Sequence, residues 1–464
     1  METLQRTANR GSVSTGPYEV GNSLKVESDN NEYLERSTSG ASDGSSTQHT
    51  ISVWVKRTEL GVDSEPVSAG GIGRFRFESD DTFSYQFRSG KEIRTNRVFR
   101  DTSAWYHIVA VGDSSQATDS NRMKLYVNGV QETSFSAATY QDQDQASPGW
   151  GKNTLYSLRV GAAASNTRNF NGYIAEMYYI DGQVLDPTYF GEFDSDTGIW
   201  IPKKFSGTHG TLDTYLDFSD SSNLGKNSGG TTDLGATNIA AADQSTDTPT
   251  NNFCTLNPLI NFKYTTNGIT EGGTVFGDDT GGGVGGAFGT MAVTAGKWYW
   301  EVKLTQQSDH YIGVSAVDDG DNVYTSTDPQ EENSTFRFNI SAARREYVNS
   351  GSQGYGSLDE FTDFHSTGDI ISIALNMDDN QISIYGNGTL QSGVANTTLY
   401  DAANKMVVPF HGTINDECQY NFGGYSVWTP SSAASDANGY GTFEYAPPSG
   451  YYALCTKNLA EFGG

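Results

Sequence analysis

Cysteine is scarce in this 464-residue sequence, which contains only Cys254, Cys418 and Cys455. An odd number of widely separated cysteines cannot form a fully paired disulfide framework, and their spacing matches no metal-binding motif. The six histidines are also far apart, which excludes a His-x-x-x-His pair of metal ligands. We therefore expect the three thiols to be buried core residues.

Positive charge is scarce as well, because 29 lysines and arginines oppose 56 aspartates and glutamates and leave a net charge of −27. Such a chain repels phosphate backbones and anionic membrane surfaces, so we expect no nucleic-acid binding through a basic patch. The acidic residues are dispersed, as on a solvated surface, and an alternative role for some of them is to hold Ca²⁺.

Long apolar runs are missing. No segment approaches the roughly 20 apolar residues that cross a membrane, and the first residues, Met-Glu-Thr-Leu-Gln-Arg, lack the apolar stretch of a signal peptide. We therefore expect synthesis in a cytoplasm, without membrane insertion or classical secretion.

Aromatic residues and turn formers are abundant. Only 35% of the residues are hydrophobic, but 12% are aromatic and 53 are glycine. Short strands joined by tight turns give this composition, and the length favours two or three domains. We predict an all-β protein with two antiparallel β-sandwich domains in tandem, joined by a long, partly ordered connector.

Alternation of apolar and polar residues marks the strands. Residues 50–56 and 123–127 have the period of half-buried strands, and Asn128-Gly129 favours a type I′ turn after the second. Residues 173–180 form another strand, and Asp186-Pro187 begins a helix of one or two turns. In the second half, the predicted strands are 298–304, 371–375, 382–384 and 407–410.

The pattern divides the chain into four parts. Between the strand-rich halves, small polar residues without periodicity cannot bury enough apolar area to offset the entropy of ordering, which indicates a connector. Aromatic residues in its first half indicate packing on a neighbouring domain. The predicted parts are a docking arm at 1–16, a sandwich at 17–195, the connector at 196–252, and a sandwich with a carboxy-terminal extension at 253–464.

Five short motifs follow one another in the first half: Thr50-Ile-Ser-Val-Trp-Val-Lys56, Trp105-Tyr-His-Ile-Val109, Met123-Lys-Leu-Tyr-Val-Asn-Gly129, Leu158-Arg-Val-Gly161 and Phe170-Asn-Gly-Tyr-Ile-Ala-Glu176. In their order and spacing, residues 18–194 resemble the laminin-G-like, concanavalin-type jelly rolls. The resemblance implies a sandwich that recognises glycans or proteins.

The second half contains Gly296-Lys-Trp-Tyr-Trp-Glu-Val302, Tyr311-Ile-Gly-Val-Ser315, Gly368-Asp-Ile-Ile371 and Asn421-Phe-Gly423. With these motifs, residues 253–425 resemble a SPRY domain, which implies a second β-sandwich used for protein recognition.

Four further stretches concern the whole chain: Trp200-Ile-Pro-Lys203, Tyr215-Leu-Asp-Phe-Ser-Asp-Ser-Ser-Asn-Leu224, Thr248-Pro-Thr-Asn-Asn-Phe-Cys-Thr-Leu-Asn-Pro258 and Tyr451-Tyr-Ala-Leu-Cys-Thr-Lys-Asn-Leu459. They are similar to virion proteins of tailed bacteriophages, notably aquatic ones. The resemblance implies a structural or tail-fibre-like component of a virus particle, assembled in the host cytoplasm and forming a homo-oligomer.

Some concanavalin-type jelly rolls are glycoside hydrolases, which need two carboxylates about 5 to 9 Å apart. The acidic residues Glu192, Asp194 and Asp196 have the alternating spacing of such a pair, but they follow the last predicted strand. Glu176 is the single acidic residue in its strand. Glu301 is predicted on the strand face opposite to the neighbouring tryptophans. We therefore expect no catalytic residues and no enzyme activity.

The laminin-G-like resemblance also implies a Ca²⁺ site, built from an acidic residue before the Trp-His strand and an asparagine near the later Phe-x-Gly. Asp101 and Asn166 occupy roughly those places and are the candidate metal ligands. No other cofactor is expected.

Ligand contacts in both families come from loops at one end of the sandwich, where flat faces and hydroxyls suit sugars and protein surfaces alike. The candidates in the irregular segments of the second half are Tyr324, Phe336, Tyr347, Tyr355 and His365. The alternative is that several of them pack beneath their own loops.

The expected function is that of a non-enzymatic virion structural protein, a fibre or adhesin component that binds a glycan or protein of the host surface. The arm at 1–16 would attach it to other virion proteins. Two alternatives stay open: an architectural adaptor or capsid decoration protein that contacts only virion partners, and a glycoside hydrolase.

Overall fold

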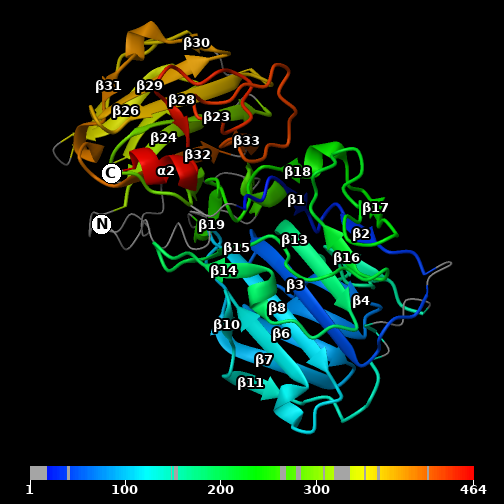
Figure 1. Cartoon of the computed structure of the whole chain (residues 1–464). Coiled ribbons are helices and arrows are strands. Elements are labelled where there is room, and N and C mark those ends of the chain that lie inside the picture. The colour runs from blue at the N-terminus through cyan, green and yellow to red at the C-terminus, as the bar shows by residue number, and fades with distance from the viewer. Residues whose placement is uncertain are drawn as a thin grey trace. The chain divides into compact units, whose positions relative to one another are not determined.

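The computed structural model describes residues 18–38, 42–147, 149–150, 155–261, 268–277, 284–306, 309–317, 335–349, 352–362, 366–414 and 417–463. The chain divides into two compact units, Met1–Asn251 and Asn252–Gly464, coloured from blue to green and from green to red in Figure 1. The docking arm predicted at 1–16 lies outside the described residues.

Unit 1 contains two large antiparallel sheets and one small sheet in its described part. The β3 sheet has the order β10 (Val130–Gln131), β9 (Met123–Val127), β8 (Trp105–Asp113), β3 (Gln48–Arg57), β13 (Gly172–Asp181), β1 (Ser23–Val26) and β18 (Gln244–Ser245), with β16 (Thr214–Leu216) paired to β13. The β6 sheet has the order β11 (Phe135–Ala138), β7 (Lys91–Val98), β6 (Thr82–Arg88), β5 (Gly73–Phe77), β4 (Ser64–Ala69), β12 (Leu158–Val160), β2 (Tyr33–Glu35) and β17 (Gly235–Thr237). The small sheet pairs β14 (Gly191–Phe193) with β15 (Trp200–Pro202), and the short 3-10 helices are η1 (Asp119–Asn121), η2 (Pro187–Tyr189) and η3 (Ala241–Asp243).

The core of unit 1 combines apolar residues of the β3 and β6 sheets. Val53 and its alternate neighbours on β3 join an aromatic cluster from the β6 sheet. In that cluster, Phe83 makes edge-to-face contacts with Phe75 and Phe77, with ring centroids 4.6 and 5.0 Å apart. These geometries suit the quadrupoles of the rings and explain why so aromatic a sequence packs well.

The other face of the β3 sheet is buried too, which corrects the prediction of a half-buried strand at 50–56. Trp54 and Lys56 lie on that face and are 1% and 0% exposed. A second apolar cluster covers the sheet there, and it brings Val109, Val111, Tyr178 and Ile180 together with Leu185, Phe190, Phe205 and Tyr215.

Residues 196–252, where the sequence indicates a connector, contribute strands β15 to β18 to unit 1. Strands β16, β17 and β18 pair with β13, β2 and β1. Beyond β18, the Asp247 carboxylate accepts hydrogen bonds from Lys56 Nζ at 2.7 Å and Trp105 Nε1 at 2.9 Å. Strands of two or three residues are too short to show periodicity, which explains why the sequence pattern weakens there.

Unit 2 is a sandwich of two further sheets in the described residues. The β24 sheet has the order β19 (Leu256–Asn261), β22 (Val284–Gly289), β32 (Val407–Ile414), β24 (His310–Ala316), β25 (Thr335–Asn339), β26 (Arg344–Asn349) and β27 (Ser352–Tyr355). The β23 sheet has the order β20 (Ile269–Thr270), β21 (Val275–Gly277), β33 (Glu417–Asn421), β23 (Lys297–Leu304), β28 (Ile370–Asn376), β29 (Gln381–Gly386) and β30 (Thr389–Leu390), with β31 (Thr397–Thr398) on β29 and β34 (Tyr452–Ala453) parallel to β23. The helices in the described residues of this unit are η4 (Glu271–Gly273), η6 (Ser392–Val394), η7 (Tyr400–Ala402) and α2 (Thr456–Phe462).

The core of unit 2 lies between these two sheets. Trp298 and Trp300 of β23 are fully buried there with Phe336 and Phe338 of β25. Glu301 belongs to the opposite face of β23, as its alternation with the tryptophans predicts.

The predicted all-β class is confirmed, and each strand predicted from alternation lies within or along an observed strand. Asn128 and Gly129 have φ of 47° and 77°, as a type I′ turn requires. Asp186 caps the short helix η2 by accepting a hydrogen bond from the backbone of Thr188 at 2.8 Å. Within the described ranges, none of the helices has the length and apolar character needed to cross a bilayer.

Candidate binding site on unit 2

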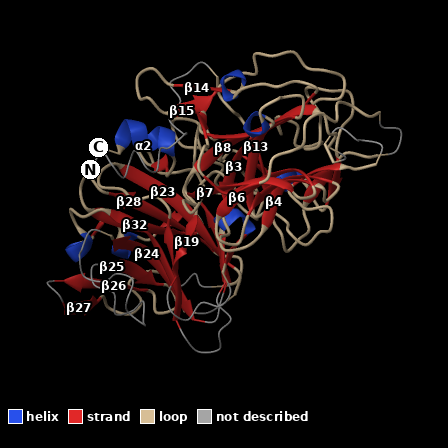
Figure 2. Ribbon diagram, turned by 90° about the horizontal axis from the view of Figure 1, so that it is seen from below, coloured by secondary structure: helices blue, strands red, loops and turns tan. Residues whose placement is uncertain are grey.

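One edge of the β24 sheet gathers aromatic and charged side chains. Strands β25, β26 and β27 lie side by side there, and β27 is the last strand of the described sheet (Figure 2). Phe336 is opposite Tyr347, whereas the next row across the strands is Arg337, Glu346 and Tyr355. Because side chains alternate along a strand, the first row faces the core and the second faces outward.

The outward row is organised around Glu346, which is 4% exposed. Arg337 donates to its Oε2 from Nε at 3.0 Å. Arg344 donates to its Oε1 from Nη2 at 2.8 Å, and the amide of Asn339 donates to the same oxygen at 3.0 Å. A carboxylate that receives charge-assisted bonds from both sides fixes the two guanidinium groups in place.

Each of these arginines also lies over a tyrosine ring. The Arg344 guanidinium carbon is 4.8 Å from the ring centroid of Tyr355, and that of Arg337 is 4.9 Å from the centroid of Tyr311. Tyr355 is 53% exposed and donates a hydrogen bond to Gln353 at 2.8 Å. The guanidinium holds one face of this ring by a cation–π contact.

The inward row ends in a stack of rings at the rim of the core. Tyr347 stacks on Tyr400 with centroids 3.8 Å apart and planes 6° from parallel, and Phe336 lies 6.4 Å from Tyr347. Both tyrosines are half-buried. A Cβ on Gly354 of β27 would lie 2.4 Å from the Tyr347 ring, so the missing side chain lets this ring lie against the edge strand.

Arg345 adds a third positive charge at this edge. Its Nη2 lies 3.3 Å from Glu360 Oε1, and its backbone NH donates to the other oxygen of that carboxylate at 3.2 Å. Arg337, Arg344 and Arg345 thus contact two carboxylates, in a chain of net charge −27. We call Arg344, Arg345, Tyr347, Tyr355 and Tyr400 the tyrosine–arginine edge.

The structure places the predicted ligand-binding residues differently. Tyr347 and Tyr355 belong to the tyrosine–arginine edge, and Tyr324 and His365 lie outside the described residues. The prediction for Phe336 needs correction, because its side chain is 0% exposed in the core. Arg344, Arg345 and Tyr400 were not predicted, although the pair of adjacent arginines two residues before Tyr347 was an available signal in so acidic a chain.

The two predicted Ca²⁺ ligands make separate hydrogen bonds. Asp101 Oδ1 accepts from the backbone NH of Ser103 at 3.0 Å, as in a tight turn. Asn166 Oδ1 accepts from Arg159 Nη1 at 2.6 Å. A Ca²⁺ ion at these residues stays a prediction, and a chelator that leaves the melting temperature unchanged would contradict it.

Glu176, a carboxylate considered for hydrolysis, is enclosed by tyrosines. Tyr18 and Tyr178 donate to its Oε2 at 2.9 Å, and Tyr215 donates to its Oε1 at 3.0 Å. Burial raises its pKa to about 7, although the three hydroxyls lower it in part. Glu176 has a φ of 47° at an irregularity of β13, and only 5% of it is exposed. These contacts describe a structural residue.

The other carboxylates considered are also held by nearby donors. Asp194 Oδ1 accepts from the backbone NH of Thr197 at 2.8 Å and caps a turn. Glu301 accepts from the backbone NH groups of Glu444 and Tyr445 at 2.9 and 2.8 Å. Both carboxylates therefore order neighbouring chain segments.

Two family models match the chain. Residues 28–186 match the model of the concanavalin A-like lectin/glucanases superfamily, and residues 297–425 match the model of the SPRY domain. The first match lies within unit 1 and the second within unit 2, so the chain carries these domains in tandem. The described residues of the tyrosine–arginine edge all fall in the SPRY match. No curated protein matches the sequence.

Solved structures with similarity to the chain include two SPRY domains and one bacterial protein. The SPRY domain of human HERC1 is 16% identical with a TM-score of 0.26, over 36% of this chain and 96% of that domain. The PSpry domain of TRIM65 is 12% identical with a TM-score of 0.28, over 36% and 88%. A candidate carbohydrate binding protein from Bacteroides ovatus is 12% identical with a TM-score of 0.28, over 48% of this chain and 60% of that one.

Proposed function

We propose that this protein is a non-enzymatic binding protein of a virus particle, and that it recognises a glycan or protein of the host surface through the tyrosine–arginine edge. The concanavalin A-like and SPRY domains in tandem fit a binding role. The proposed location in a virus particle rests on the resemblance of the connector and carboxy-terminal motifs to tailed-bacteriophage virion proteins.

The exposure of Tyr355 is the observation that carries the proposed site. This ring is 53% exposed, and Arg344 orders it from one side. An ordered aromatic face offers apolar area at little entropic cost, and tyrosine and arginine are enriched where proteins bind partners. The apolar face of a sugar ring or of a protein side chain can stack on such a surface, while the guanidinium group of Arg344 binds its oxygens.

Repetition on a particle would strengthen such a site. A single exposed tyrosine edge is small compared with a standard protein interface, so we expect weak binding per copy. Many copies on one particle raise the effective concentration at the host surface, and attachment then becomes tight without any new contact.

The test is binding of the purified full chain to host cells and to an array of host-surface glycans. Tyr355→Ala should weaken binding about 5- to 30-fold, the effect of losing about 1 to 2 kcal/mol at a contact residue. Phe193→Ala is the matched control, because Phe193 is an aromatic residue with a similar exposure of 54% that belongs to unit 1, whereas the edge belongs to unit 2. Circular dichroism verifies that both variants are folded.

Three outcomes would contradict the proposal. If the purified chain binds neither the cells nor the glycans, the result favours an adaptor or decoration protein that contacts only virion partners. Steady release of reducing ends from polysaccharides would reveal a hydrolase. Absence of the protein from purified particles, measured by mass spectrometry, would remove the virion setting.

A further inference from the structure

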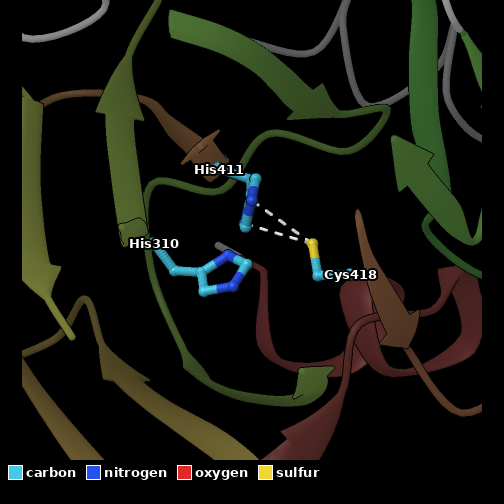
Figure 3. Close-up of side chains that lie close together, drawn as sticks. All are labelled: His310, His411 and Cys418. Atoms are coloured by element: carbon cyan, nitrogen blue, oxygen red, sulfur yellow. Dashed lines mark hydrogen bonds between the residues drawn. The ribbon is translucent and has the colours of Figure 1, made fainter. Parts of the chain in front are cut away.

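The interior of unit 2 contains a cluster of two histidines and one cysteine that the binding function does not use. His310 is the first residue of β24, His411 lies in β32, and Cys418 is the second residue of β33. Strands β24 and β32 are neighbours in one sheet, whereas β33 belongs to the other sheet. The three side chains meet between the sheets and are 0% exposed (Figure 3).

The register of the strands explains why the two imidazoles lie together. His411 is paired with Ile312, and His310 precedes Ile312 by two residues on the same strand. Residues two apart on a strand share a face, so both histidines point into the core as diagonal neighbours. Their ring centroids are 5.7 Å apart.

The thiol reaches the histidines from the opposite sheet. Cys418 Sγ lies 3.3 Å from His411 Nε2 and 3.5 Å from its Nδ1, the two contacts drawn in Figure 3. One potential ligand atom from each of the three residues lies within 4.8 Å of the others. Three donors of this kind converge on one point in the core.

These distances are close to those around a bound metal ion. With metal–sulfur and metal–nitrogen bonds of about 2.3 and 2.0 Å and angles between tetrahedral and trigonal, ligand atoms are about 3.3 to 3.7 Å apart. The distance of 3.5 Å between Cys418 Sγ and His411 Nδ1 already lies in this range. The separations that involve His310 are at most 4.8 Å, and a side-chain rotation can close the remaining gap.

The donor set selects the class of metal. Thiolate and imidazole are soft and borderline ligands that favour Cu⁺ and Zn²⁺, whereas Mg²⁺ and Ca²⁺ require oxygen ligands. Each imidazole binds the ion as the neutral ring, because coordination requires a free lone pair on the ligating nitrogen. One thiolate with a monovalent ion and neutral imidazoles has no net charge, which minimises the cost of burial.

We propose that His310, His411 and Cys418 bind one soft d10 metal ion, Cu⁺ or Zn²⁺, in the core of unit 2. Binding forms one metal–sulfur bond and two metal–nitrogen bonds, and the proton of the Cys418 thiol is released to solvent. The ion ties the β24 sheet to the β23 sheet. The charge balance favours Cu⁺, because Zn²⁺ with these three ligands would leave one positive charge in the core.

The test is titration of the metal-free full chain with Cu⁺ and, separately, with Zn²⁺ under anaerobic conditions. Gel filtration followed by elemental analysis should find one ion per chain, and X-ray absorption of the unmutated protein should find one sulfur and two nitrogen ligands. Bound metal should also raise the melting temperature, because it binds only the folded state. With both ions present, retention of Cu⁺ supports the charge argument, and retention of Zn²⁺ with sulfur ligation identifies the divalent ion at the same site.

Two variants locate the site. Cys418→Ser should lower metal affinity at least about 100-fold, since it removes the thiolate itself. Cys254→Ser is the matched control, because Cys254 is another buried cysteine of unit 2, and it should retain the ion. Failure of the unmutated chain to retain either ion, absorption spectra without sulfur ligation, or full retention by folded Cys418→Ser would overturn the proposal.

Discussion

Glu301 makes the stability of unit 2 depend on pH in a way that can be measured. The residue is 0% exposed on β23, and burial raises its pKa from 4.5 to about 7. The Glu444 and Tyr445 backbone NH groups, and the side chains of Tyr299 and Asn421, donate to its oxygens and lower the pKa in part. The folded protein therefore keeps this proton to a higher pH than the unfolded chain does.

The magnitude follows from the difference between these pKa values. At about 1.4 kcal/mol for each pKa unit, the contribution of Glu301 to the free energy of unfolding is about 3 kcal/mol lower above pH 7 than below pH 4.5. The sign is that of a raised carboxyl pKa: the stabilisation is complete below pH 4.5 and is lost as the pH rises through about 7. Glu301→Gln has no proton to lose, so this loss should disappear.

The assay is urea unfolding of the full chain between pH 4.5 and 8, read by hydrogen–deuterium exchange of peptides from β23, which isolates unit 2. The wild type should lose about 3 kcal/mol more than Glu301→Gln over this range. Tyr299→Phe is the control, since it keeps the carboxyl group: the pH dependence should persist and move to higher pH, because one donor to the carboxylate is lost. Parallel curves for the wild type and Glu301→Gln would refute the assignment.

The same substitution has a second consequence at the carboxy-terminal segment. A glutamine presents one oxygen and one NH₂ group, so the backbone NH of Glu444 or of Tyr445 meets a donor in place of an acceptor. An unsatisfied buried donor costs about 1 to 3 kcal/mol. Amide exchange at residues 443–445 should accelerate at every pH, and unchanged protection there would show that Glu301 does not hold the segment.

Two other substitutions test the packing of each unit. Asp247→Ala removes the partner of Lys56, whose Nζ lies 2.7 Å from the carboxylate, and both side chains are at most 1% exposed. The free energy of unfolding of unit 1, measured with urea, should fall by about 3 to 5 kcal/mol, because the lysine charge stays buried without its partner. A decrease below about 1 kcal/mol would contradict a buried pair. Gly354→Ala places a Cβ 2.4 Å from the Tyr347 ring and should displace that ring from Tyr400. Ligand binding should therefore weaken, while the circular dichroism spectrum stays unchanged. Unaltered binding would exclude Tyr347 from the site.

Local alternation predicted the strands well, because the pleat of a strand places every second side chain on the same face. Trp298 and Trp300 are in the core and Glu301 is on the other face, as the sequence indicates. Trp54 shows the limit of this reasoning. Its face of β3 is covered by chain more than a hundred residues downstream, including Phe190 and Phe205 on the same sheet face, and no local pattern records which segment will return.

The candidate binding site was only partly predictable. Alternation in residues 335–339 distinguishes Phe336 from Arg337 and was a signal for the buried position of the phenylalanine. The row of Arg337, Glu346 and Tyr355 depends on the register between three strands, which the sequence does not state. Tyr400 reaches the site from a distant turn and becomes visible only after folding.

The sequence by itself determined the all-β class, the acidic surface and the two kinds of sandwich, because composition, period-two alternation and short motifs are local properties of the chain. Only the tertiary structure decided which residues meet. His310 and His411 lie far apart in sequence and Cys418 lies seven residues beyond His411 in a strand of the other sheet, yet strand register and the packing of two sheets bring them to one point. Such contacts depend on which distant strands pair and in which register, and local sequence patterns do not encode that pairing.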